Sequence, residues 1–241
     1  MSSMRARVAD VVPFSWVDGP GNRYVVFLQG CSFDCLACHN PETIAPRCAA
    51  TRDPTVAEVV EQIRPAEPYL AGVTVSGGEA SAQWRFVREL FGALGEDPVL
   101  RRLTRFVDTN GHALPRVWDE LVPLTDGFMV DLKALDPQVH RRLTGRSNDL
   151  VLGSIRHLYA AGRLHEVRLL LVPGINDTAD QLSRTAAWLA DLDPSLRVVV
   201  IGFRRHGVRP EHRWLEESAP ERLAAARETL AEGGLRTLVT V

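Results

Sequence analysis

The sequence predicts an α/β protein folded as a partial (β/α)6 TIM-like barrel with a short N-terminal hairpin. Short β-rich runs alternate with amphipathic helical patterns along the 241 residues, which is typical of a parallel sheet with right-handed crossovers. About six strand–helix units fit, fewer than the eight of a complete barrel. A doubly wound open sheet has the same alternation, so the pattern alone leaves the strand order open.

The expected strands are rich in Val, Leu, Ile and Phe, and most of them run into Gly, Asp or Pro. They span residues 24–29, 73–76, 105–108, 128–131, 167–172, 197–202 and 235–241. Helical patterns lie between them at 55–64, 82–94, 114–121, 148–161, 178–191 and 220–232. Asp53-Pro54 is a typical helix start and Gly162 a typical stop. Residues 5–22 are too short for another unit and are expected to form a hairpin. The chain is therefore expected to be one domain, with residues 1–22 as an extension and 23–241 as the partial barrel.

The composition excludes several classes of protein. A hydrophobic share of 45%, a charged share of 24% and a net charge of −2 indicate a globular chain with no electrostatic preference for nucleic acid or membrane surfaces. No apolar run is long enough to span a membrane, and the first ten residues lack the pattern of an export signal. The expected location is the cytoplasm.

One residue stands out against the composition. Of the 28 basic residues only Lys133 is a lysine, and Met129 is the only methionine beyond position 4. Such a skew is typical of a GC-rich genome, in which lysine codons are disfavoured. A lysine retained against that bias is a candidate for chemistry.

All four cysteines lie between positions 31 and 48, which excludes a disulfide scaffold for a chain of this length. Cys31, Cys35 and Cys38 form a CxxxCxxC motif directly after the first expected barrel strand. Three thiolates bind three corners of a [4Fe–4S] cube and leave one iron open for a ligand. Zinc would need a fourth ligand, for which His39 or Cys48 is available. The spacing favours iron–sulfur over zinc.

The residues around these cysteines resemble a known family. The CxxxCxxC motif after the first expected strand is similar to the radical S-adenosylmethionine (SAM) superfamily, and it is flanked by the phrase Asp18-Gly19-Pro20-Gly21, the run Phe27-Leu28-Gln29-Gly30 and the ending Cys38-His39-Asn40-Pro41. Within it they resemble the glycyl-radical-enzyme activases, the group that includes pyruvate formate-lyase activating enzyme, and above all its YjjW-type branch. The resemblance implies one [4Fe–4S] cluster that cleaves SAM reductively, and a 5′-deoxyadenosyl radical that takes a hydrogen atom from carbon. YjjW-type activases carry a cysteine-rich insert that this chain lacks, so no second cluster is expected.

Two strand ends supply the expected SAM contacts. Gly77 and Gly78 would let the backbone approach a ligand closely, and the resemblance assigns Glu79 to the SAM amino group. Taken alone, the paired glycines predict only a turn. Asp108, Thr109 and Asn110 end the next strand, where Asp and Thr also commonly cap helices.

The later strands supply the remaining candidates. By resemblance, Met129 and Asp131 join Asp108 and Thr109 at positions that hold a monovalent cation near SAM. Lys133 would balance Asp131 or reach the SAM carboxylate, the alternative being a simple ion pair. Arg168, inside the fifth expected strand, would grip the SAM carboxylate unless it faces solvent. His206 is assigned to the ribose or adenine, with Arg204 as its competitor. His39 is expected to cover part of the adenine, because Ala37 replaces an aromatic residue common in the superfamily.

Two functions remain open from the sequence. An activase would remove a hydrogen atom from a glycine of a partner glycyl radical enzyme. Alternatively, the same machinery would act on a sugar or another natural product as an epimerase, with Cys48 as the hydrogen-atom donor. The simpler alternative is that Cys48 is a buried apolar residue or a remnant of the cysteine-rich insert that this chain lacks. Either enzyme would need a reducing partner such as flavodoxin or ferredoxin.

Overall fold

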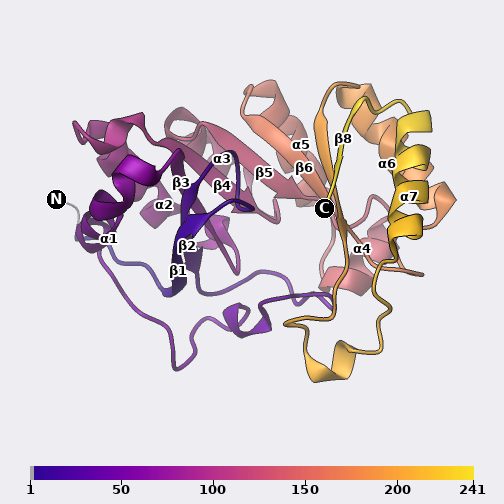
Figure 1. Ribbon diagram of the computed structural model, residues 1–241, viewed down its shortest axis with the longest axis horizontal. Coiled ribbons are helices and arrows are strands. Elements are labelled where there is room, and N and C mark those ends of the chain that lie inside the picture. Colours follow the sequence, from indigo (N-terminus) through magenta and orange to yellow (C-terminus); the bar gives the residue numbers. More distant parts are fainter. Residues whose placement is uncertain (1–2) are drawn as a thin grey trace.

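Eight strands form one sheet in which they follow the order of the chain (Figure 1). The computed structural model describes residues 3–241. The strands are β1 (Val8–Ser15), β2 (Arg23–Leu28), β3 (Gly72–Gly77), β4 (Thr104–Thr109), β5 (Gly127–Asp131), β6 (Leu164–Leu171), β7 (Arg197–Gly202) and β8 (Thr237–Thr240). β1 pairs antiparallel with β2, and every later pair is parallel. A doubly wound sheet reverses its strand order, so the sequential order confirms the partial barrel.

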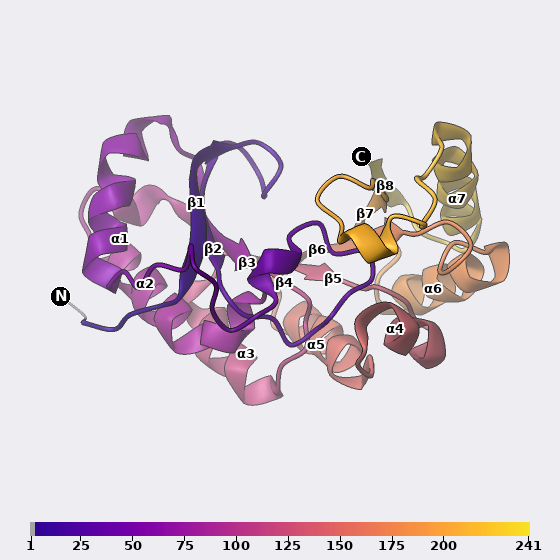
Figure 2. The same ribbon diagram turned by 90° about the horizontal axis from the view of Figure 1, so that it is seen from below.

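Within residues 3–241, seven α-helices cover the outside of this sheet, arranged around it as an arc (Figure 2). They are α1 (Val56–Ile63), α2 (Trp84–Glu96), α3 (Pro115–Leu121), α4 (Pro137–Thr144), α5 (Asp149–Ala160), α6 (Ala179–Leu192) and α7 (Pro220–Glu232). Short 3-10 turns lie at Pro41–Thr43, Arg64–Tyr69, Ala80–Gln83, Leu100–Arg102, Val122–Leu124 and Pro210–His212. The main core fills the space between sheet and helices, and includes fully buried Leu90, Trp118 and Phe128. None of the helices in residues 3–241 is long and apolar enough to cross a membrane.

The structure adds one helix that the periodicity did not predict. α4 lies between β5 and α5, so one crossover contains two helices. Asp136 caps its start by accepting hydrogen bonds from the backbone N–H groups of Gln138 and Val139, and Gly145 ends it with a left-handed φ of 76°. Both signals are local and readable, but Val139 and Leu143 are the only hydrophobic residues of α4, too few for a clear hydrophobic period.

The expected hairpin consists of β1, β2 and the loop between them, and this loop reaches the inside of the barrel. Thr74 Oγ1 on β3 donates to the backbone oxygen of Asp18 (2.7 Å). Arg23, fully buried at the start of β2, donates to Pro20 O and Thr74 Oγ1 in the same region. The hairpin loop is therefore fastened to the interior of the sheet.

A second, smaller core lies beside the loop that follows β2. It joins Ala37 of that loop to Leu143 on α4, Val172 after β6 and Phe203 after β7. The loop is also paired with the end of α4, because the backbone N–H groups of Asp34 and Leu36 donate to Thr144 O (3.0 Å) and Leu143 O (2.9 Å). The cysteine loop thus rests on two distant parts of the chain.

Candidate functional site

A cavity of about 280 Å³ opens at the carboxyl ends of the parallel strands, where barrels of this type build their sites. The cysteine loop forms one wall. The ends of β3, β4, β5 and β6 form the other, through Glu79, Asp108, Asp131, Lys133 and Arg168. Thirteen predicted site residues line this cavity: Cys31, Cys35, Cys38, His39, Gly77, Gly78, Glu79, Asp108, Thr109, Asn110, Asp131, Lys133 and Arg168.

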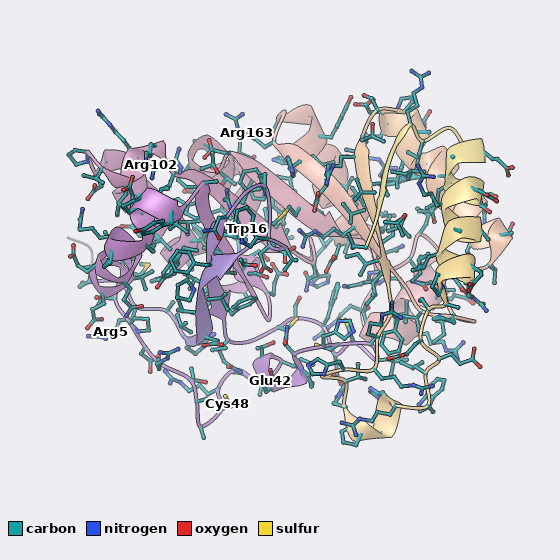
Figure 3. All side chains as sticks on the ribbon, in the orientation of Figure 1. Arg5, Trp16, Glu42, Cys48, Arg102 and Arg163 are labelled. Atoms are coloured by element: carbon teal, nitrogen blue, oxygen red, sulfur yellow. The ribbon has the colours of Figure 1, made fainter. Side chains whose placement is uncertain are left out.

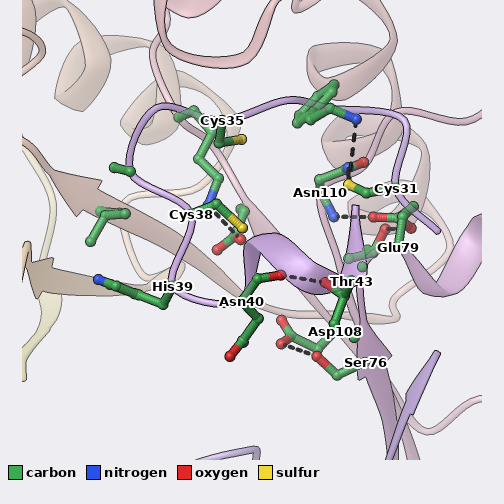
Figure 4. A pocket seen from close by; sticks show the side chains of 18 of the residues that line it. Cys31, Cys35, Cys38, His39, Asn40, Thr43, Ser76, Glu79, Asp108 and Asn110 are labelled. Carbon is green, nitrogen blue, oxygen red and sulfur yellow. Dashed lines mark hydrogen bonds and ion pairs between the residues drawn. The ribbon is translucent and has the colours of Figure 1, made fainter. Parts of the chain in front are cut away.

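The three motif cysteines face a common space above the cavity (Figure 4). All three are free thiols and only partly exposed. Burial raises the pKa of the Cys31 thiol to about 11 and that of Cys35 to about 12, and it also raises the pKa of Cys38. Such thiols ionise only when a metal draws the proton off, as a cluster does.

The donor set suits a cluster better than a single ion. The motif supplies three free thiols, and each thiolate of a [4Fe–4S] site binds a different iron, which leaves the fourth iron open. Asn110 Nδ2 lies 3.7 Å from Cys31 Sγ, and the Phe33 N–H donates to the same sulfur (3.4 Å). These donors would stabilise a thiolate at Cys31.

The paired glycines bring the end of β3 against the cysteine loop. A Cβ on Gly77, whose φ is +114°, would lie 2.2 Å from Leu28 N. A Cβ on Gly78 would lie 2.5 Å from both Gly30 O and Thr43 O. Glycine is therefore required at both positions because the backbone here lies against the chain's own backbone, and not against a ligand. This packing brings Glu79 to the wall of the cavity.

Glu79 is a buried carboxylate held by three donors. Its Oε1 accepts from the Ser81 N–H (2.7 Å) and from Thr109 Oγ1 (2.5 Å), and its Oε2 accepts from the Asn110 N–H (2.7 Å). Burial raises the pKa of Glu79, although these hydrogen bonds oppose the rise. Thr109 and Asn110 thus hold Glu79 in place from the next strand.

Arg168 points into the barrel and meets anions of the chain itself. Its Nη1 donates to Asp108 Oδ1 (3.2 Å) and its Nε donates to Glu166 Oε1 (2.6 Å). Burial would lower the pKa of Arg168, but Asp108 and Glu166 raise it above its usual range. Its Nη2 donates to Met129 Sδ (3.0 Å), and fully buried Met129 does not line the cavity. The Met129 side chain therefore packs behind Arg168.

The two aspartates nearby differ in their partners. Asp108 accepts from Ser76 Oγ (2.9 Å) as well as Arg168, and burial raises its pKa to about 6. Asp131 accepts from Lys133 Nζ (2.7 Å). Burial alone would lower the pKa of Lys133, but Asp131 raises it. The single lysine is therefore a partly buried cation at the cavity wall, paired with Asp131.

His39 lines the cavity but packs against the protein. Its ring stacks on Phe203, with centroids 5.8 Å apart and planes at 13°, and its Nε2 donates to Arg204 O (2.9 Å). These contacts join the cysteine loop to the segment after β7. The ring is thus already stacked on one side.

Two predictions are wrong in placement. His206 is exposed and does not line the cavity, because the chain turns outward at Gly207, which packs on the His39 backbone. Cys48 lies on an outer loop at the edge of the molecule (Figure 3), where it is exposed and beside Thr51. It therefore does not reach the cavity as a hydrogen-atom donor.

Asp18 and Ser76 also line the cavity, although the sequence did not single them out for a role. Asp18 comes from the hairpin loop, where its Oδ2 accepts from Ser15 Oγ (2.5 Å). The motif phrase contained Asp18, and Ser76 stands directly before the paired glycines. Asp18 reaches the cavity because the hairpin loop folds back over the sheet, and the sequence pattern does not predict that path.

Comparisons with known proteins agree with this geometry. The model of the radical SAM superfamily matches residues 25–189. The pyruvate formate-lyase-activating enzyme of Staphylococcus aureus strain USA300 is 35% identical over 217 residues, which cover 88% of this chain and 85% of that protein. The crystal structure of a domain of the pyruvate-formate lyase-activating enzyme from Bacteroides vulgatus has a TM-score of 0.57 and 23% identity, covering 70% of this chain and 98% of that one. A radical SAM methyltransferase from Sphaerobacter thermophilus shares the fold with a TM-score of 0.65 and 21% identity, over 91% of this chain and 66% of that one. The chain belongs to the radical SAM superfamily, in the group of glycyl-radical-enzyme activases, and is an iron–sulfur-dependent radical enzyme.

Proposed function

We propose that this chain activates a glycyl radical enzyme by removing a hydrogen atom from a glycine of that partner. The observation that carries the proposal is the convergence of three thiols and the SAM-type side chains on one cavity at one edge of the sheet. When bound, the [4Fe–4S] cluster and SAM supply the one-electron chemistry that removes hydrogen from carbon. Cys31, Cys35 and Cys38 would hold the cluster and leave one iron for SAM.

The remaining residues would orient SAM and keep it from water. Glu79 presents a carboxylate to the SAM amino group, and its three internal donors keep that carboxylate from turning away. Arg168 keeps N–H groups beyond those it gives to Asp108 and Glu166, and these suit the SAM carboxylate. Lys133 offers a second cation at the same wall. Apolar Phe27, Leu170 and Ile201 complete the lining and limit access of water.

The charge of the cavity supports a monovalent cation beside SAM. Four carboxylates line it, from Asp18, Glu79, Asp108 and Asp131, against the two cations Lys133 and Arg168. A sulfonium and an ammonium group on SAM reduce this excess, and Asp108, Asp131 and the Thr109 hydroxyl are oxygen ligands that suit an alkali ion. The Met129 backbone oxygen remains part of this proposal, whereas its side chain is occupied by Arg168.

The partners follow from the activity proposed. The glycyl radical enzyme would offer a peptide loop at the open side of the cavity, and flavodoxin or ferredoxin would supply the electron. Four cysteines without a disulfide support a reducing compartment, and we place the chain in the cytoplasm. The position of Cys48 gives no support to the epimerase alternative.

Electron paramagnetic resonance tests the proposal directly. The reconstituted chain, given SAM, a reductant and a purified glycyl radical enzyme from the same genome, should generate the glycyl doublet. Cys35→Ala should abolish both the doublet and the formation of 5′-deoxyadenosine, because one corner of the cluster loses its ligand. Cys48→Ala is the matched cysteine control and should retain both. SAM cleavage without any doublet on the glycyl radical enzymes of that genome would contradict the proposed substrate.

A further inference from the structure

A basic surface is contributed by two segments beside the cysteine loop, the end of α4 and residues 203–214 after β7. None of its arginines lines the SAM cavity. We name it the outer basic face, and it consists of Arg141, Arg142, Arg146, Arg204, Arg205, Arg209 and Arg213. The two segments, 139–147 and 203–214, contain seven arginines and one carboxylate, Glu211, in a chain whose net charge is −2.

Both segments are attached to the cysteine loop. Arg146 Nε donates to Ser32 O (3.1 Å), and Arg209 Nη2 donates to Asp34 Oδ1 (2.7 Å) and Cys35 O (3.2 Å). Figure 2 views the molecule from the side where α4 and the segment after β7 lie beside this loop. Arg146 and Arg209 therefore tie the two segments of the outer basic face to the cysteine loop.

The loop is thin at this point. Cys31 lines the SAM cavity, and it also lines a shallow hollow on the outer side together with Phe33, Asp34, Arg146 and Arg209. Electron transfer falls off steeply with distance, so a donor seated in this hollow would be close to the cluster. SAM and its substrate would occupy the opposite side, and the two events would not compete for space.

Most of these arginines form no ion pair. Among the described residues, only Arg209 of the seven pairs with carboxylates, those of Asp34 and Glu211. Arg146, Arg204 and Arg205 donate to backbone oxygens, which leaves their charges without a carboxylate partner. Exposed cations without carboxylate partners create a local positive potential and attract a partner of opposite charge.

Resting on the proposed function, which needs an external electron, we propose that the outer basic face docks an acidic one-electron carrier protein of the flavodoxin type. One electron leaves the reduced carrier for the cluster, and no atom moves and no bond forms or breaks in that step. The arginines act by steering and orienting the carrier. They take no part in holding SAM.

The test compares two charge-neutralised double variants in the reconstituted enzyme. Arg142→Gln with Arg146→Gln removes two charges from the outer basic face. Arg101→Gln with Arg163→Gln removes two exposed arginines that precede β4 and β6, at the opposite edge of the sheet (Figure 3 labels Arg163). The first readout is binding of oxidised flavodoxin to each protein, measured by calorimetry at two ionic strengths. The second is the rate of cluster reduction by flavodoxin hydroquinone, followed by visible absorbance, with dithionite as the chemical reductant in parallel.

We expect the first variant to lose about tenfold in the second-order rate constant at low ionic strength, with weaker flavodoxin binding and a smaller salt dependence. Arg142→Lys with Arg146→Lys should restore the rate constant and the binding, because steering depends on charge and not on the geometry of the guanidinium group. The opposite-edge control should match the wild type, and dithionite should reduce all variants equally.

Four outcomes would overturn the docking proposal. They are unchanged flavodoxin binding and rate in the first variant, an equal loss in the opposite-edge control, failure of the lysine variant to restore the rate, and an equal loss with dithionite. Loss of the glycyl doublet in the first variant under dithionite, with SAM cleavage intact, would assign the face to the glycyl radical enzyme instead. Absence of any doublet in the wild type would contradict the proposed function alone, because flavodoxin binding and cluster reduction are measured without the partner.

Discussion

Asp108→Asn should change how the stability of the cluster-free chain depends on pH. Asp108 is buried at the end of β4, where its Oδ2 accepts from Ser76 Oγ and its Oδ1 from Arg168. An asparagine has the same shape. It can accept from Arg168 through its oxygen and donate to the Ser76 hydroxyl through its nitrogen. The substitution therefore removes the buried charge and keeps both hydrogen bonds.

The magnitude follows from the pKa of Asp108. Burial raises it from 3.8 to about 6, although Arg168 opposes the rise. The folded chain thus binds this proton more tightly than the unfolded chain, and ionisation destabilises the fold as pH rises through the window from about 4 to 6. This loss of folding free energy is small below that window. Above the window it reaches its full value of about 3 kcal/mol. Between pH 4.5 and 7.5 the wild type should lose about 2 kcal/mol through this group.

Urea unfolding at the two pH values measures this effect as a double difference. The stability of Asp108→Asn relative to the wild type should be about 2 kcal/mol more favourable at pH 7.5 than at pH 4.5. Titrating groups that do not interact with Asp108 cancel, because both proteins contain them. Asp10→Asn, at an exposed position of β1, should give parallel pH profiles. Parallel profiles for Asp108→Asn as well, or a larger gain at pH 4.5, would refute the reasoning about burial.

Three further predictions concern the cavity wall. Gly78→Ala should lower the free energy of unfolding of the cluster-free chain by about 1–3 kcal/mol, because its Cβ would meet Gly30 O and Thr43 O at 2.5 Å; unchanged urea midpoints would contradict this. Glu79→Gln should weaken SAM binding to the reconstituted enzyme by at least about tenfold, because the charged acceptor is lost, and equilibrium dialysis that finds equal affinity would reject the role. His206→Ala should leave SAM affinity unchanged in the same dialysis, because the side chain is exposed and away from the cavity; a clear loss would restore it to the site.

The sequence predicted the parts of the site that depend on strand ends. Parallel strands present their carboxyl ends at one edge, so polar residues that end successive strands must meet there. Glu79, Asp108, Asp131 and Lys133 therefore came together as expected. Arg168 points inward, which is one of the two orientations that the sequence left open, and a strand arginine inside a barrel needs an anion. Its anionic partners, however, are Asp108 on β4 and Glu166 on its own strand. This pairing depends on the register between the strands, which the sequence pattern does not give.

The failures lie in segments whose path is set by tertiary contacts. His206 and Cys48 occupy long connections, and nothing local in their sequence fixes whether such a side chain faces inward. Gly207 packs against the His39 backbone and turns the chain outward, while the loop of Cys48 runs over the surface. Asp18 is the converse case, since the contact with Thr74 folds its loop back over the sheet. Periodicity carries no information on any of these three.

The cysteine loop separates two regions of opposite charge, and that separation explains why one short loop can serve two reactants. On its inner side, four carboxylates against two cations favour a ligand with positive groups, as SAM has in its sulfonium and ammonium. On its outer side, seven arginines favour an acidic protein. Each reactant is attracted to one side and repelled from the other, because like charges disfavour the wrong approach. The inner charges are at least partly buried and therefore less screened by salt, whereas most of the outer ones are exposed and strongly screened. Raising the ionic strength should accordingly slow the delivery of the electron well before it weakens the binding of SAM.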